Sequence, residues 1–334
     1  MRTLLNLAEI QIRRTNNIRY STLLKIVPKF LLCAFSLLTL TFAPANINAK
    51  ESSHISYSEL SDSLITNNDS LLLVNSDWIV KQVEPGIELR QIQFSNNELF
   101  GSSQFISIIE IEPRLGKIIE IVASPILVET SSLAIANNAI AAINGSFFKF
   151  NYELNTIDYN SVDYIRKEGK QLAPNTYTSN DRAMHQMGAL AIYEGEMYIL
   201  KADNLKEWEN YIQASQVITT GPILRVNGID ENLKTNSFYT TRHPRTAVAK
   251  KDNGNILFFN VDGRAKESAG MSLEELQATL RWLGASYIIN LDGGGSTTMY
   301  VKGQPGNGIV NHPSDNKIFD NEGARKVANI IIVK

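Results

Sequence analysis

The hydrophobic and polar positions along the chain predict a sheet-rich fold. From Ile87 onward, short runs rich in β-branched and aromatic residues alternate with polar or Gly/Pro-containing turns, the pattern of antiparallel strands. Asp252-Asn253-Gly254 joins two such runs, and Asn-Gly supplies the positive φ values of a tight hairpin. Residues 151–188 are polar and predict loops. The runs expected to be strands are 87–94, 105–111, 117–122, 139–143, 189–193, 197–200, 217–220, 246–250, 255–261 and 286–291.

One segment has the period of a helix. Ser272 begins a capping box with Glu275, apolar residues then repeat on one helical face, and Gly284 ends the pattern. This helix joins the runs 255–261 and 286–291, and a right-handed crossover of this kind makes its two strands parallel. The predicted fold class is α+β: a mixed, mostly antiparallel sheet core with a C-terminal β-α-β unit and flanking helices.

The N-terminal region predicts export. Basic residues precede the apolar run 30–42, and Ala45 and Ala49 follow as candidate cleavage positions, as in a secretory signal peptide. The run is about 13 residues, short of the roughly 20 that cross a bilayer as a helix. We expect a signal peptide at 1–49, a linker or N-terminal lead-in at 50–76 and one folded domain at 77–334, in a secreted or periplasmic protein with no stable membrane span.

Composition and charge narrow the classes of partner. With 43% hydrophobic and 20% charged residues, the chain has ordinary globular usage. Its 32 basic and 34 acidic residues leave a formal charge of -2, which gives no general attraction to nucleic acid. The single cysteine, Cys33, lies inside the apolar run, and the four histidines have no zinc-binding spacing. Any function must therefore be argued from a local site.

Two acidic residues directly follow the strands of the predicted β-α-β unit. Asp262 and Asp292 should stand at the same edge of the sheet, where α/β sheets bind ligands. Asp292 opens the sequence Asp-Gly-Gly-Gly-Ser-Thr, whose backbone amides suit phosphate or sugar oxygens. This loop lacks the lysine of a P-loop and the context of a dinucleotide fold. Either Asp-Gly pair alone is also a common turn.

Basic residues lie close to these acids in the predicted hairpin. Arg245 begins one strand where Val261 ends its neighbour, so Arg245, His243 and Arg264 can converge near Asp262. Guanidinium groups bind phosphate through paired hydrogen bonds. A surface turn is the alternative for this cluster. Asn144 is a candidate partner for sugar hydroxyls and equally a candidate turn residue.

Together, several motifs resemble those of the phosphodiester glycosidase family, over about residues 80–334. Ser146 departs from the family pattern, in which Gly is usual after Asn-Gly. The motifs, in chain order, are Ala141–Phe148, Thr220–Leu224, Arg245–Ala247, Val261–Arg264, Ser272–Gly284, Asn290–Thr298 and Arg325–Asn329.

The resemblance implies that 77–334 is a catalytic domain hydrolysing sugar-1-phosphodiesters at the glycosidic C–O bond, on glycan or envelope polysaccharide substrates. A phosphate leaving group, whose second pKa is about 6, needs little proton donation. The expected catalytic residues are Asp292, Asp262, Arg245 and His243. The expected substrate-binding residues are Asn144, Gly145, Arg264, Gly293, Gly294, Gly295, Ser296 and Thr297.

Two alternatives stay open at this stage. The same acids could hold calcium or magnesium in a metal-dependent phosphodiesterase, whereas the glycosidase interpretation requires no cofactor. The chain could also be a non-catalytic polysaccharide-binding or exopolysaccharide assembly protein that kept the pocket. If Arg245 binds phosphate, Arg245→Ala should reduce turnover far more than melting temperature.

Overall fold

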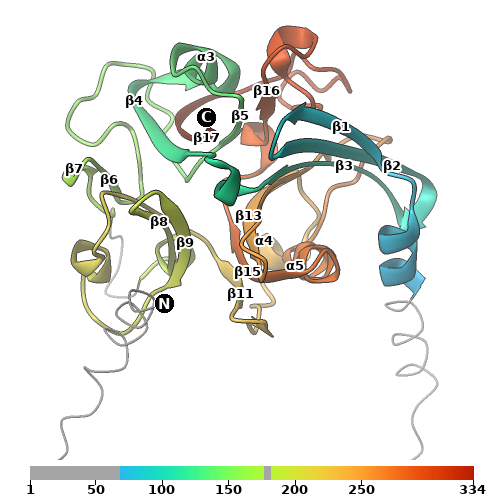
Figure 1. Ribbon diagram of the computed structural model, residues 1–334, viewed down its shortest axis with the longest axis horizontal. Helices are drawn as coiled ribbons and strands as arrows, with labels where there is room; N and C mark the ends of the chain where they lie inside the picture. The colour runs from blue at the N-terminus through green and yellow to red at the C-terminus, as the bar shows by residue number, and fades with distance from the viewer. Residues whose placement is uncertain (1–67, 177–181) are drawn as a thin grey trace, which may run out of the picture. The chain divides into compact units, whose positions relative to one another are not determined.

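The computed structural model describes residues 68–176 and 182–334 (Figure 1), all within one compact unit, Ile55–Lys334. The predicted signal peptide lies outside the described residues, as does most of the predicted linker. Residues 68–75 are helical, and Leu73 is fully buried in a core cluster. This helix lies within the segment expected to be a linker or N-terminal lead-in, and Leu72 and Leu73 pack against the core.

The described residues form three antiparallel sheets, which confirms the mostly antiparallel fold. The eight-stranded sheet has the order β1 (Ile79–Glu84), β2 (Ile87–Leu99), β3 (Ser102–Ile111), β14 (Ile256–Val261), β13 (Arg245–Lys251), β15 (Ala285–Asn290), β11 (Ile223–Val226), β12 (Ile229–Asp230). The four-stranded sheet has the order β16 (Met299–Val301), β5 (Ala141–Asn144), β17 (Lys326–Val333), β4 (Ile119–Glu129). The five-stranded sheet has the order β7 (Lys170–Ala173), β6 (Ile165–Lys167), β10 (Gln216–Thr220), β8 (Gly188–Tyr193), β9 (Glu196–Lys201).

The region 151–188 was expected to be loops, and this is wrong at two places. It contains β6 and β7, which form a hairpin at the edge of the five-stranded sheet. Strands of three and four residues are too short to give a periodic hydrophobic signal. The five-stranded sheet is therefore larger than the sequence pattern indicates. The segments beside β6 also carry two residues of the candidate active site.

Helix α5 (Leu273–Trp282) connects β14 to β15. Both strands pair antiparallel with β13, so they run in the same direction on either side of it. The helix begins with the expected capping box: the Ser272 hydroxyl accepts from the Glu275 N–H, and the Glu275 carboxylate accepts from the Ser272 N–H. As a result β14 and β15 end at the same edge of the sheet, on either side of the first residues of β13.

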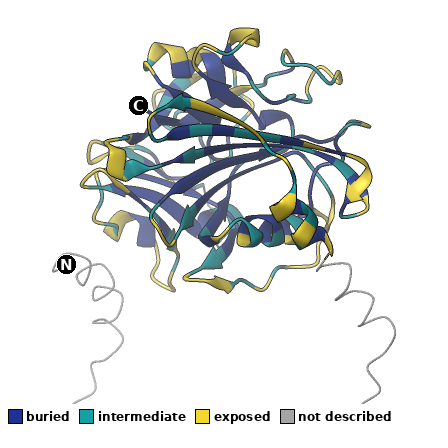
Figure 2. Ribbon diagram, turned by 45° about the vertical axis from the view of Figure 1, so that its right-hand side comes forward, coloured by how far each residue is buried: buried dark blue, intermediate teal, exposed yellow. Residues whose placement is uncertain are grey.

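The core lies on both faces of the eight-stranded sheet. Phe258 belongs to the cluster shared with the other two sheets, and its neighbour Phe259 belongs to the cluster covered by α5, as the two-residue period of a strand requires. Figure 2 shows the strands as mostly buried and the connecting turns as exposed. The helices seen in residues 68–176 and 182–334 are all too short or too polar for a membrane crossing.

Candidate active site

The two Asp-Gly turns pack against the same residue, Pro244. A Cβ added to Gly263 would lie 2.8 Å from the Pro244 nitrogen, and one added to Gly293 would lie 2.7 Å from the Pro244 carbonyl oxygen. The Gly294 N–H also donates to that oxygen at 2.8 Å. Asp262 and Asp292 therefore stand at one edge of the sheet, on either side of β13. Their environments differ.

Asp262 is almost completely buried, and its carboxylate is occupied. Oδ1 accepts from the Asn311 side chain at 2.8 Å, and Oδ2 accepts from the His312 N–H at 2.9 Å and lies 2.8 Å from His312 Nδ1. Both oxygens are directed at N–H groups, which also makes them poor ligands for a hard cation. These contacts tie Asp262 to the segment 311–312, and its expected catalytic role stays a prediction.

Asp292 is only partly buried and has a titrating carboxyl group. Burial raises the pKa of Asp292 to about 6, against the opposing effects of the Ser296 hydroxyl, the Arg325 charge, the Gly293 N–H and His185. Its Oδ1 accepts from the Gly293 N–H at 2.9 Å. A carboxyl group with a pKa near neutrality and access to solvent has the properties of an acid–base or nucleophilic catalyst.

An aspartate–histidine pair adjoins Asp292, and the sequence analysis missed it. Asp163, fully buried, lies 2.5 Å from Nδ1 of His185 through its Oδ1. Burial raises the pKa of Asp163 to about 7, even though His185 and the Phe147 N–H lower it. Burial alone would lower the pKa of His185, but the attraction of Asp163 and Asp292 outweighs it and raises that pKa. His185 therefore stands within electrostatic reach of both acids.

Arg325 is a second residue to which the sequence analysis gave no role. It precedes β17 and pairs with Asp315 through two hydrogen bonds of 2.7 Å. Its positive charge lowers the pKa of Asp292, and its guanidinium carbon lies 5.2 Å from the centre of the exposed Phe150 ring. Arg325 belongs to the motif Arg325–Asn329 identified in the sequence, but the motif alone did not indicate a chemical role for it.

The glycine loop 293–295 lies between two guanidinium groups. Arg264 Nη2 would be 2.8 Å from a Cβ at Gly294, whose φ of +61° also favours glycine. On the other flank, a Cβ at Gly295 would overlap Asp315 and Arg325. The loop can therefore bring an anion close to Arg264, which is exposed, and to Arg325, which is partly buried.

The predicted basic cluster forms, and one of its members, Arg245, is buried. Burial and the charges of Arg245 and Arg264 lower the pKa of His243, so these three residues are neighbours. Arg245, however, is 2% exposed and donates Nε to the Met271 carbonyl at 2.9 Å and Nη2 to the carbonyls of Phe238 and Thr241 at 2.8 and 3.0 Å. Burial lowers its pKa to about 10. Through these contacts Arg245 holds the backbone around helix α4 (Ser237–Thr240), and its expected phosphate-binding role stays a prediction.

Asn144 and Gly145 are buried beneath the loop. The Asn144 side chain donates to the Asp292 carbonyl at 2.6 Å, and its oxygen accepts from Thr246 Oγ1 and the Thr298 N–H. The Gly145 carbonyl accepts from the Asp292 N–H at 3.0 Å, and a Cβ at Gly145 would overlap the Asn329 side chain. These contacts fix the backbone of Asp292, and the expected contact of Asn144 and Gly145 with sugar stays a prediction. Ser296 and Thr297 are likewise at most 1% exposed.

The described residues hold no group of three or more His, Cys, Asp or Glu side chains arranged for a metal ion. The titratable groups around the loop are instead placed for proton transfer and anion binding. Asp292 faces His185 and Arg325, and the exposed Arg264 covers Gly294. This arrangement fits a site that handles a negatively charged substrate with a carboxyl group as the reacting base or nucleophile.

Comparison with known proteins agrees with this class of site. The sequence profile of the phosphodiester glycosidase family matches residues 137–334, more than half of the chain, and the chain belongs to that family. It is 28% identical over 155 residues to mouse N-acetylglucosamine-1-phosphodiester alpha-N-acetylglucosaminidase, covering 45% of this chain and 26% of that protein. It is 32% identical over 74 residues to the SPbeta prophage-derived uncharacterized protein YomE of Bacillus subtilis, covering 22% of this chain and 11% of that protein. The matches thus span about a quarter or less of these relatives.

Solved structures share the fold. The catalytic domain of the zebrafish N-acetylglucosamine-1-phosphodiester alpha-N-acetylglucosaminidase, auto-inhibited by its pro-peptide, superposes with a TM-score of 0.55 at 19% identity, over 77% of this chain and 87% of that one. A hypothetical protein from Synechocystis gives a TM-score of 0.51 at 17% identity, over 77% of this chain and 64% of that one. At these identities the likeness concerns the fold.

Proposed function

We propose that this protein is a secreted glycosidase that hydrolyses sugar-1-phosphodiesters at the glycosidic C–O bond, releasing a free sugar and a phosphomonoester. The observation that carries the proposal is the placement of Asp292. Its pKa of about 6 leaves it largely ionised at neutral pH, beside His185 and next to a glycine loop flanked by Arg264 and Arg325. Family membership supports glycosidase chemistry on phosphodiester sugar substrates.

In this mechanism Asp292 acts at the anomeric carbon, against an oxocarbenium-like transition state. It either attacks that carbon or takes a proton from the attacking water. In both routes the C–O electron pair leaves with the phosphate, and water supplies the new hydroxyl of the sugar. Arg264 neutralises the departing phosphate, and His243 is an auxiliary donor beside it. This residue set differs from the sequence-based hypothesis, in which Arg245 and Arg264 together bind the phosphate.

The Asp163–His185 pair holds a proton close to the reaction. Asp163 and Asp292 raise the pKa of His185 and so favour its cationic form, which can donate to an oxygen of substrate and recover the proton afterwards. Asp163 fixes the imidazole through the 2.5 Å contact to Nδ1, and this orients the opposite nitrogen. Because Asp163 is fully buried, it does not reach the substrate itself, and it acts as a positioning residue for His185.

The proposed location and substrate rest on the sequence. The basic and apolar N-terminal pattern supports export, and the family supports a glycan phosphate as substrate. We propose glycan or envelope polysaccharide phosphodiesters as the substrate class. The sugar named in the mouse relative, N-acetylglucosamine, is the first to test.

Hydrolysis in ¹⁸O-labelled water tests the bond that breaks. The sugar should carry the label, because water adds to the anomeric carbon. Label in the phosphate would mean P–O cleavage and would contradict the glycosidase mechanism. A broad panel of glycosyl phosphodiesters that bind without releasing reducing sugar would instead identify a non-catalytic binding protein.

A further inference from the structure

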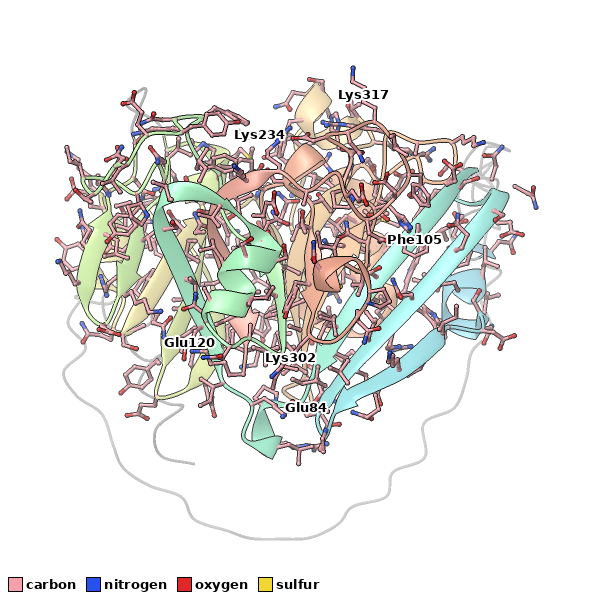
Figure 3. All side chains as sticks on the ribbon, turned by 90° about the horizontal axis from the view of Figure 1, so that it is seen from above. Glu84, Phe105, Glu120, Lys234, Lys302 and Lys317 are labelled. Atoms are coloured by element: carbon pink, nitrogen blue, oxygen red, sulfur yellow. The ribbon has the colours of Figure 1, made fainter. Side chains whose placement is uncertain are left out.

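A pocket of about 300 Å³ lies beside the glycine loop, and of its lining residues only Arg264 takes part in the mechanism above. Two segments line it, 263–267 after β14 and 312–319 before β17. Lys317 is at the outer edge of the molecule in Figure 3, and Phe105, also labelled there, packs against the base of the 312–319 segment through His312 and Phe319. A cavity of this volume can hold a small polar group or one sugar unit.

The charge of this pocket is positive. Arg264, Lys266 and Lys317 line it, whereas Glu267 is its one acidic lining residue. Lys266 forms an ion pair with Glu267, with Nζ 3.6 Å from Oε1. Among the described residues, no ion pair joins Arg264 or Lys317 to an acid. Two cationic groups are therefore left uncompensated at a concave surface, which favours an anionic ligand.

The pocket also has a fixed wall with an unused hydroxyl group. The His312 ring stacks on Phe319 at 3.8 Å between centroids, and Asp262 holds its Nδ1. The Ser314 hydroxyl is buried without a hydrogen-bond partner. The nearby Asp320 carboxylate is already engaged by the Asn316 side chain and the Glu322 N–H. The pocket wall therefore offers the Ser314 hydroxyl as a donor, while the Asp320 carboxylate already has hydrogen-bond partners.

Arg264 connects this pocket to the proposed reaction centre. Its guanidinium group lies against Gly294, and the same residue lines the pocket. A scissile phosphate bound by Arg264 at the loop would direct the group esterified to it, the aglycone, towards Lys317. We propose that the pocket binds a second anionic group, a carboxylate or a phosphate, on the aglycone of the substrate. This inference rests on the proposed function.

The test compares three N-acetylglucosaminyl 1-phosphodiesters that differ only at the end of the aglycone: 2-hydroxyethyl, 2-carboxyethyl and 2-phosphoethyl. The two charged substrates should have kcat/KM values about 10-fold above the neutral one at low salt, with the difference shrinking as salt screens the exposed lysines. The carboxyl and phosphate arms distinguish an acidic sugar from a second phosphate as the natural group.

Two variants test which residues produce the preference. Lys317→Ala should reduce the charged-to-neutral ratio of kcat/KM about 3-fold, and Lys317→Glu about 10-fold, since exposed ion pairs contribute modestly. Lys302→Ala is the matched control, because Lys302 is an exposed lysine distant from the pocket residues in Figure 3. A ratio that stays unchanged in both Lys317 variants would overturn the proposal.

Direct binding separates this proposal from the proposed function. The product analogues 2-carboxyethyl phosphate and 2-hydroxyethyl phosphate are titrated calorimetrically into wild-type protein and Lys317→Glu. Preference for the charged analogue, lost in Lys317→Glu, supports the pocket even if no substrate is cleaved, in which case the proposed function fails alone. Equal cleavage of all three substrates with equal binding would reject the pocket alone.

Discussion

Two aspartate–histidine pairs lie near the same sheet edge, and they differ in how many donors reach the carboxylate. The Asp262 carboxylate accepts hydrogen bonds from the Asn311 side chain and the His312 backbone N–H, and it also contacts the His312 ring nitrogen Nδ1. Asp163, equally buried, has two such partners, the His185 ring and the Phe147 N–H, and burial raises its pKa to about 7. Burial of a carboxyl group with few donors favours its protonated form.

The comparison shows why residue type alone did not separate Asp262 from Asp292, the proposed catalytic residue. The sequence placed Asp262 and Asp292 on equal terms, each after a strand and before a glycine. The structure distinguishes them by their surroundings: Asp262 has no open oxygen, while Asp292 borders the less satisfied pair and titrates near pH 6. Function is expected where the charge is incompletely compensated.

The largest expected effect is that of Asp292→Asn. Removing the carboxylate should reduce kcat about 10³-fold, since a positioned acid or base contributes about 10²–10⁴-fold. Because the raised pKa means that the folded state disfavours the ionised carboxyl, this carboxyl costs stability as the pH rises from about 4 to above 6. At pH 7 the free energy of unfolding of the variant should therefore be about 1–2 kcal/mol higher than that of wild type, and its melting temperature should rise accordingly. This gain should vanish near pH 4.

Calorimetric melting at pH 4 and pH 7, alongside turnover, measures both effects. A variant that loses activity and stability together would assign Asp292 to the fold. Wild-type-like turnover would remove it from the mechanism.

His185→Gln should have the next largest effect on rate. Loss of the proton donor is expected to lower kcat about 10²-fold. In wild type, activity should rise with pH through about 6 as Asp292 ionises and fall at higher pH as His185 loses its proton, whose pKa is raised. His185→Gln should abolish the high-pH decline, measured as log kcat against pH. A profile whose decline persists would exclude His185 as the acid, and His312→Gln is the matched variant that should retain it.

Asp262→Asn tests the other pair through stability. The substitution leaves one of the three N–H donors around that buried site facing an amide nitrogen, so unfolding free energy should fall by about 2–4 kcal/mol. Urea denaturation followed by tryptophan fluorescence gives this value. The pH dependence of residual activity should keep the wild-type shape. A stable Asp262→Asn protein with an altered pH profile would return Asp262 to the reaction centre.

Arg325→Gln should have the smallest effect. Arg325 lowers the pKa of Asp292, so its removal should move the low-pH limb of the activity profile to higher pH, by less than about one pH unit. Asp315→Asn, which removes the partner of Arg325 but keeps the charge, should leave the limb in place or move it down. A downward shift in Arg325→Gln would mean that the limb does not report Asp292.

The fold was largely predictable, and the site only in part. Hydrophobic alternation located most strands, and the capping box located α5, because these signals are local. Strands β6 and β7 were missed because they are short, and with them the segment that carries Asp163. His185 was found in the sequence but had no local partner, since its aspartate lies 22 residues away. The hydrogen bonds of Arg245 could not be predicted, because its partners are backbone carbonyls, which no sequence motif records.

The pairing of β17 with β5 has a consequence for the order of folding events. The Asn329 side chain accepts from the Ser146 N–H across 183 residues, and β5 leads directly into the segment that fixes Asp292. Closing so long a loop carries a large entropic penalty, and contacts of this separation form slowly. We therefore expect the pairing of β17 with β5, and with it the fixed position of Asp292, to form late in folding.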